Sequence, residues 1–157
     1  MPDQSATEIH LQRSFNAPPA RVFDALSKPA SVPSWLGPSD AYRVTVHAWD
    51  CKPGGKLRVE FVTPEKVTHI VVGIFKEVTP HTRLAFTWTW EGQPVIDSLV
   101  TFALRPEGKG TALVLTHTGF PSTDMRNHHN EGWLGTLDRL ARALAAPGLT
   151  HLANLFL

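Results

Sequence analysis

Histidine and carboxylate side chains give this sequence its clearest potential for acid–base chemistry. His117 shares one face of a strand-like segment with Leu113 and Leu115, so its imidazole would face an apolar interior. Asp97 is the only acidic residue of segment 95–105, and if it also faced inward it could poise His117 as a general acid or base. The alternative is that His117 is a hydrogen-bonded core residue and that Asp97 is a solvated carboxylate. We favour this alternative, and therefore binding over catalysis.

A row of aromatic residues offers a surface for an apolar ligand. Phe86, Trp88 and Trp90 alternate along segment 83–91, which puts successive rings about 7 Å apart on one face of a strand. We expect Phe86 in the packed core, whereas Trp88 and Trp90 lie toward the strand end, where a cavity would open. The predicted ligand-binding residues are Trp35, Phe61, His69, Trp88, Trp90, Phe102, His117 and Trp133.

Other arrangements of reactive residues give weaker indications of a functional site. His128, His129 and Glu131 stand at positions i, i+1 and i+3 of a predicted helix and do not all point one way, so we predict surface residues and no metal site. The single Cys51 excludes an internal disulfide, and we expect no thiol mechanism. The sequence has no Gly-x-Ser-x-Gly motif, phosphate-binding loop or dinucleotide fingerprint, and we predict no cofactor.

Clusters of proline and glycine divide the chain into the elements that must position these residues. We predict strands over residues 8–15, 42–46, 56–62, 67–78, 83–91, 95–105 and 111–118, with short connections that suit antiparallel neighbours. A short helix over 20–27 follows two prolines, and a brief helix or turn spans 29–35. Segment 122–146 is helical by period, with one apolar stripe formed by Trp133, Leu137, Leu140 and Leu144.

The composition is that of a folded globular domain. The 157 residues suffice for one domain, which we place at residues 8–146, and 42% hydrophobic with 18% charged residues exclude general disorder. A net charge of +1 lacks the excess expected of a nucleic-acid binder. The N-terminus has no signal-peptide pattern, and the longest apolar stretch, 70–75, is far too short to span a membrane. We therefore expect a cytoplasmic protein that contacts neither nucleic acid nor membrane.

Several segments in a fixed order carry a family resemblance: 15–26 with Trp35 downstream, 73–80, 83–88, 110–120, Gly132-Trp133 and 137–140. Together they resemble the START-like (SRPBCC) superfamily, specifically the branch named after activators of the heat-shock-protein-90 ATPase, over roughly residues 8–146. This resemblance implies an α+β, helix-grip fold. In that fold a curved antiparallel sheet of about six or seven strands wraps a long C-terminal helix, with one or two short helices after the first strand.

The superfamily includes lipid carriers, cyclases, ligand-binding proteins and co-chaperone domains, so the resemblance leaves three functions open. We expect a small apolar, lipid-like or aromatic ligand in a cavity between sheet and helix. The second hypothesis is a cyclase- or hydrolase-type enzyme that uses a cavity histidine. The third is a co-chaperone-like or stress-related module acting on a heat-shock-protein-90 homologue, which we disfavour because 157 residues leave no room for the activators' separate N-terminal domain.

The tail, residues 147–157, is unusually apolar for a chain end. Leu149, Leu152, Leu155 and Phe156 could share one face of a short helix. Such a face would pack back on the domain or cover a second copy of the chain. We therefore keep a homodimer through these four residues as a hypothesis.

Overall fold

The computed structural model describes residues 6–145 and contains the predicted strands and helices in the predicted order. Its elements are β1 (Ile9–Phe15), α1 (Pro19–Ser27), the 3-10 helix η2 (Pro29–Ser34), β2 (Arg43–Trp49), β3 (Lys56–Val62), β4 (Thr68–Thr79), β5 (Arg83–Thr87), β6 (Thr89–Trp90), β7 (Leu99–Glu107), β8 (Gly110–Thr118) and α2 (Thr123–Ala145). The homodimer hypothesis concerns tail residues outside the described range.

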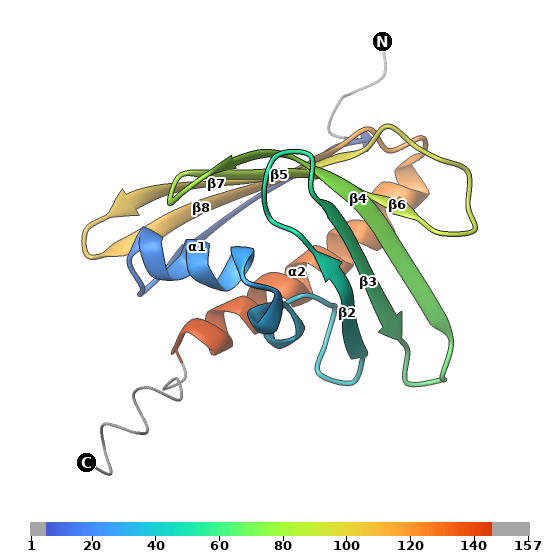
Figure 1. Ribbon diagram of the computed structural model, residues 1–157, viewed down its shortest axis with the longest axis horizontal. Coiled ribbons are helices and arrows are strands. Elements are labelled where there is room, and N and C mark those ends of the chain that lie inside the picture. The colour runs from blue at the N-terminus through green and yellow to red at the C-terminus, as the bar shows by residue number, and fades with distance from the viewer. Residues whose placement is uncertain (1–5, 146–157) are drawn as a thin grey trace.

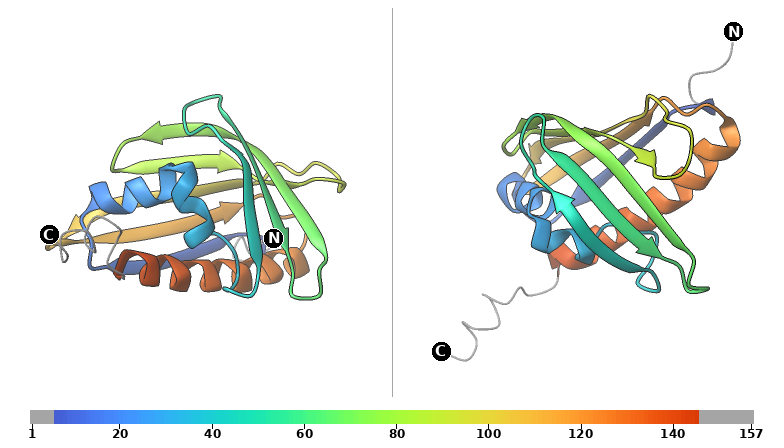
Figure 2. Two further views of the ribbon diagram at one scale, coloured as in Figure 1. Left: turned by 60° about the horizontal axis from the view of Figure 1, so that its bottom comes forward. Right: turned by 45° about the vertical axis from the view of Figure 1, so that its right-hand side comes forward.

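The strands form one antiparallel sheet in the order β1-β8-β7-β5-β4-β3-β2, with β6 pairing separately with β4. The sheet curves over α2, while α1 and η2 lie beside one end of the helix (Figures 1 and 2). This arrangement confirms the predicted α+β helix-grip fold. Within residues 6–145, no helix combines the length and hydropathy that a bilayer crossing requires.

The core lies between the concave face of the sheet and α2. The predicted stripe of α2 is buried there, with Trp133 3% and Leu140 0% exposed. The helix α1 begins with Pro19. Proline suits this first position because it has no N–H, and an N–H there would have no partner within the helix. Its apolar face, Val22, Phe23 and Leu26, is buried as well. Burial of these faces joins both helices and the sheet into one hydrophobic core.

Two predicted strands differ from the structure near Trp88. The segment predicted as one strand over 83–91 divides into β5 and β6, because Trp88 leaves the regular ladder. The backbone N–H of Trp88 donates to the Ser98 carbonyl, while the Ser98 hydroxyl donates to the Trp88 carbonyl. The strand predicted over 95–105 correspondingly begins only at Leu99. The Ser98 hydroxyl thus takes the place of a main-chain donor to the Trp88 carbonyl, and the regular pairing of β5 with β7 ends here.

Candidate ligand-binding pocket

A pocket of about 680 Å³ lies between the sheet and the N-terminal half of α2. This volume falls in the range of pockets that hold small molecules. Three parts of the chain line it: the loop after η2, the strands β3, β4 and β6 with their neighbours, and α2. The lining residues are Leu36, Gly37, Pro38, Tyr42, Phe61, Thr68, His69, Ile70, Trp88, Trp90, Glu91, Gln93, Met125, His128, His129, Gly132, Trp133 and Thr136.

Aromatic rings form the inner walls of this pocket. The indole of Trp88 lies 5.2 Å from that of Trp133 and 5.6 Å from that of Trp90, in the latter case nearly perpendicular. Phe61 packs against Trp90 at 5.8 Å. Because these tilted and edge-to-face contacts fix the rings against one another, the walls resist collapse into the empty space.

A chain of hydrogen bonds behind the wall fixes the indole of Trp133 and the main chain of Trp88. Trp133 Nε1 donates to His117 Nδ1 at 2.9 Å, so the imidazole carries its proton on Nε2. His117 Nε2 in turn donates to Ser98 Oγ at 3.1 Å, and that hydroxyl donates to the Trp88 carbonyl. The chain therefore connects α2, β8 and the Trp88 main chain through groups that are all buried.

His117 is held neutral by this environment. Its side chain is fully buried, and burial, followed by the nearby His129, lowers the pKa of His117 well below the ordinary 6.5. Both ring nitrogens are engaged in the neutral form. Asp97 is exposed, outside any strand, and does not pair with His117, whose partners are Ser98 and Trp133. The two residues therefore do not form the acid–base pair considered from the sequence.

A second tryptophan–histidine pair lies nearer the pocket opening. Trp90 Nε1 donates to His129 Nε2 at 2.8 Å, and His129 Nδ1 lies 2.9 Å from the Met125 carbonyl. Burial lowers the pKa of His129, although its bond to Met125 opposes this shift. His128, next to it, is exposed. The sequence prediction placed His129 on the surface and missed its role in the wall.

The pocket opens where its lining residues are exposed. His69, Glu91 and Gln93 are all exposed there, and the ring of His69 lies 6.1 Å from Trp90. The Glu91 carboxylate is held by a two-pronged pair with Arg58, with both nitrogen–oxygen distances at 3.0 Å. The opening is therefore polar, whereas the interior is aromatic.

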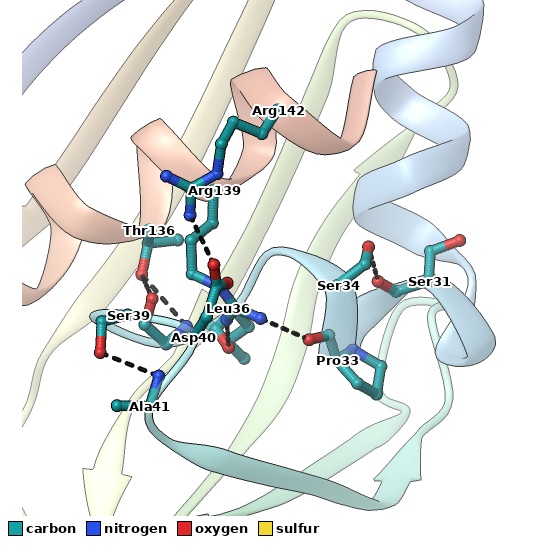
Figure 3. Close-up of polar contacts among 11 residues, drawn as sticks. Ser31, Pro33, Ser34, Leu36, Ser39, Asp40, Ala41, Thr136, Arg139 and Arg142 are labelled. Atoms are coloured by element: carbon teal, nitrogen blue, oxygen red, sulfur yellow. Dashed lines mark hydrogen bonds and ion pairs between the residues drawn. The ribbon is translucent and has the colours of Figure 1, made fainter. Parts of the chain in front are cut away.

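The loop after η2 is fastened to α2 by polar side chains of the helix (Figure 3). Arg139 is 7% exposed and donates to the carbonyls of Pro33 (2.8 Å) and Leu36 (2.7 Å) and to the Asp40 carboxylate (2.9 Å). Thr136 Oγ1 accepts from the Gly37 N–H and donates to the Gly37 carbonyl. These bonds hold the loop that forms one side of the pocket.

Helix α2 approaches this loop so closely that one position requires glycine. A Cβ atom at Gly135 would lie 2.0 Å from the Pro38 carbonyl oxygen, which backbone packing does not permit. At Gly132, one turn earlier, the nearest atom to such a Cβ is Pro38 Cγ at 3.9 Å. The helix therefore touches the loop at Gly135 and leaves the pocket open at Gly132.

The structure brings five of the eight predicted ligand-binding residues to the pocket lining: Phe61, His69, Trp88, Trp90 and Trp133. Trp35, Phe102 and His117 do not line it and lie fully buried in the core. Trp35 donates its indole N–H to the Ala25 carbonyl and packs on Phe102 at 5.9 Å. Contact of the five lining residues with a ligand stays a prediction.

Metal-ligating side chains and the Cys51 thiol are the other groups that could react. Within residues 6–145, no group of three or more His, Cys, Asp or Glu side chains is placed to hold a metal ion. Partial burial, with the nearby Asp50, raises the pKa of the Cys51 thiol to about 11. Since the thiolate is the reactive form, Cys51 is a poor nucleophile at neutral pH.

Comparisons with known proteins place these features in context. The model of the family described as activator of Hsp90 ATPase homolog 1-like protein matches residues 16–145. A search of curated proteins finds no match. Protein CV1439 from Chromobacterium violaceum is 27% identical with a TM-score of 0.80, covering 89% of this chain and 98% of that one. The AHSA1 protein from Silicibacter pomeroyi is 28% identical with a TM-score of 0.79, covering 88% and 97%. A Rhodobacter sphaeroides protein is 26% identical with a TM-score of 0.77, covering 94% and 98%.

Proposed function

The chain belongs to the activator of Hsp90 ATPase homolog 1-like family, and we propose that it binds a small, largely apolar ligand in the pocket between the sheet and α2. The observation that carries this proposal is the pocket of about 680 Å³ with walls of Trp88, Trp90 and Trp133. The indole N–H groups of Trp90 and Trp133 are already bonded to histidines. The indole N–H of Trp88 is buried without a partner among residues 6–145. The walls therefore offer a ligand mainly ring faces, so an apolar body fits them best.

The bonding of His117 and His129 argues against acid–base catalysis by either of these two histidines. A general acid or base must reach the proton that it transfers, directly or through one water. His117 lies behind Trp133, and both nitrogens of His117 and of His129 are engaged within the protein. A cyclase or hydrolase mechanism through His117 would have to break this bonding first. Action on a heat-shock-protein-90 homologue and a cytoplasmic location stay predictions that rest on the sequence.

Intrinsic tryptophan fluorescence tests the proposal directly, since three of the residues that line the pocket are tryptophans. We expect saturable quenching by at least one member of a panel of fatty acids, flavonoids and aromatic polyketides, added at neutral pH. Equilibrium dialysis with the same compounds gives the stoichiometry, which should be one ligand per pocket. If no compound of the panel binds saturably, the proposed function is wrong.

Gly132→Leu is expected to abolish this binding while the domain stays folded. Gly132 lines the pocket with open space beside it, so a leucine would project into the ligand volume. Replacing a helical glycine also favours the helix by about 0.5–1 kcal/mol, so the loss of binding should not come from unfolding. The matched control is Glu131→Leu, because Glu131 is exposed and outside the lining. Equal binding by both variants would place the ligand elsewhere.

A further inference from the structure

The bond between Trp90 and His129 is where the short strand β6 meets helix α2. Trp90 ends β6, which has only two residues, and residues 91–98 after it form no helix or strand. Both side chains line the pocket, so their bond joins its two opposing walls. The loop beyond Trp90 contributes Glu91 and Gln93 to the opening. The Trp90 indole N–H therefore ties this side of the opening to α2, while the pairing of β6 with β4 and the Arg58–Glu91 pair hold it to the sheet.

The geometry fixes which form of His129 can hold Trp90. The Met125 carbonyl accepts only, so His129 Nδ1, 2.9 Å away, must carry a proton. In the neutral ring Nε2 is then a bare acceptor, and Trp90 donates to it. In the protonated ring Nε2 carries a second proton, which would face the indole N–H, donor against donor. Protonation therefore removes this bond without touching the bond to Met125.

We propose that the Trp90–His129 hydrogen bond is a proton-operated latch, which holds the β6 side of the pocket against α2 and releases it when His129 is protonated. The proposal rests on the proposed function only in its consequence, that a bound ligand exchanges faster at acidic pH. The latch itself is a property of the empty protein.

The groups around His129 set the pH at which the latch opens. His128 precedes it on α2, the neutral ring of His117 on β8 lies 5.5 Å away, and Phe120 packs at 4.9 Å. Across Trp90 lies His69 of β4, and Glu91 is paired with Arg58. The lowered pKa of His129 agrees with these surroundings, since burial and the positive potential of His128 both oppose its protonation. The latch therefore opens at a lower pH than an ordinary histidine would set.

The deeper pair provides an internal reference for the latch. Trp133 donates to His117 in the same manner, but His117 is completely buried, whereas His129 is half-buried. Protonation therefore reaches His129 before His117. The inner wall stays fixed when the outer pair separates, so the proposal predicts local opening and not unfolding.

The first test needs no ligand. In 15N-labelled protein, two-dimensional NMR follows the imidazole nitrogens of His129 and the indole N–H of each tryptophan between about pH 7.5 and 4.5. We expect an Nδ1–H tautomer of His129 at neutral pH, and a Trp90 indole shift that follows the titration of His129 while the Trp133 indole stays constant. An Nε2–H tautomer, or a Trp90 signal that ignores the titration of His129, would overturn the proposal.

The second test measures exchange of Nile red, an uncharged probe, by stopped-flow fluorescence. In the unaltered protein its dissociation should accelerate by about fivefold from neutral to acidic pH, the factor that corresponds to one lost hydrogen bond of typical strength. Trp90→Phe lacks the donor and should release the probe fast at both pH values. His129→Gln keeps an acceptor near the Nε2 position but cannot titrate, so its rate should be slow at both.

His128→Gln is the matched control for these variants. It should keep the acceleration and move its midpoint to higher pH, because a like charge beside His129 is removed. An acceleration that persists in His129→Gln, or that disappears in His128→Gln, would contradict the latch. If Nile red fails to bind at all, its use as a stand-in for the ligand fails and the claim of faster exchange is withdrawn, while the NMR titration still decides the latch.

Discussion

Arg139→Ala is expected to lower the free energy of unfolding by about 3 kcal/mol, a large loss for one side chain in a domain of this size. The Arg139 guanidinium reaches three acceptors in η2 and in the loop after it, at Pro33, Leu36 and Asp40 (Figure 3). Removing it leaves two loop carbonyls without their donors, next to a cavity the size of the lost side chain. Each buried group left unpaired costs about 1–3 kcal/mol.

The carboxylate partner contributes little to this expected loss. The Asp40 side chain is 73% exposed, so water replaces Arg139 as its partner at small cost. Arg139→Lys should therefore recover only part of the stability, since one ammonium group cannot follow the planar arrangement of three acceptors. The loop that carries Leu36 and Pro38 would loosen, and ligand binding should weaken together with stability.

Urea unfolding followed by circular dichroism measures this effect, with Arg142→Ala as the matched control. Arg142 also pairs with Asp40, at 3.1 Å, but its side chain is 63% exposed. Exposed pairs contribute about 0–1 kcal/mol, so this control should stay close to the unaltered protein. Equal losses in the two alanine variants would mean that the ion pair, and not the capping of the loop carbonyls, stabilises the loop.

The role of Arg139 also shows where inference from the sequence ends. Its acceptors are carbonyls more than a hundred positions away, and carbonyls leave no trace in residue types. His129 is different, because it stands four residues before Trp133 and so extends the predicted stripe of α2 by one turn. Extending that helical period would have placed His129 against the sheet, whereas the spacing to His128 and Glu131 directed attention to metal ligands.

Strand alternation placed the aromatic wall more reliably than it placed strand ends. Phe86, Trp88 and Trp90 do contact one another in succession, at 6.2 and 5.6 Å, as a period of two requires. The β-branched and aromatic residues of segment 95–105 put Asp97 in a predicted strand, whereas β7 begins two residues later. The cause is the Ser98 hydroxyl, which bonds to the Trp88 carbonyl. Such a local substitution of side chain for backbone has no periodic signal.

The domain is expected to lose stability steeply as the pH falls below about 6.5, because folding keeps two histidines neutral. The pKa values of His117 and His129 are both lowered from 6.5 in the folded protein. Below that pH the unfolded chain takes up protons that the folded chain refuses, so protons favour unfolding. Each such histidine contributes a slope of up to about 1.4 kcal/mol per pH unit, and above pH 6.5 the slope should vanish.

The contributions of His129 and His117 to the slope of stability against pH should end at different pH values. His129, half-buried, takes up its proton in the folded state first, and its share of the slope ends there. His117 is completely buried and continues to resist, so a slope of one proton should persist to lower pH. Carboxylates generally bind protons only near pH 4.5 and below, so above that pH the slope of stability comes from histidines.

Urea unfolding at half-unit pH steps between about 7.5 and 5 resolves these slopes, with His117→Gln and His129→Gln each expected to remove one proton's share. Slopes are compared rather than absolute stabilities, because His117→Gln also disturbs the bonds to Trp133 and Ser98. His10→Gln, at an exposed site on β1, is the surface control. A flat profile in the unaltered protein would show that His117 accepts a proton while folded. In that case Trp133 would lose its acceptor at the same pH, and the inner wall of the pocket would titrate together with the outer one.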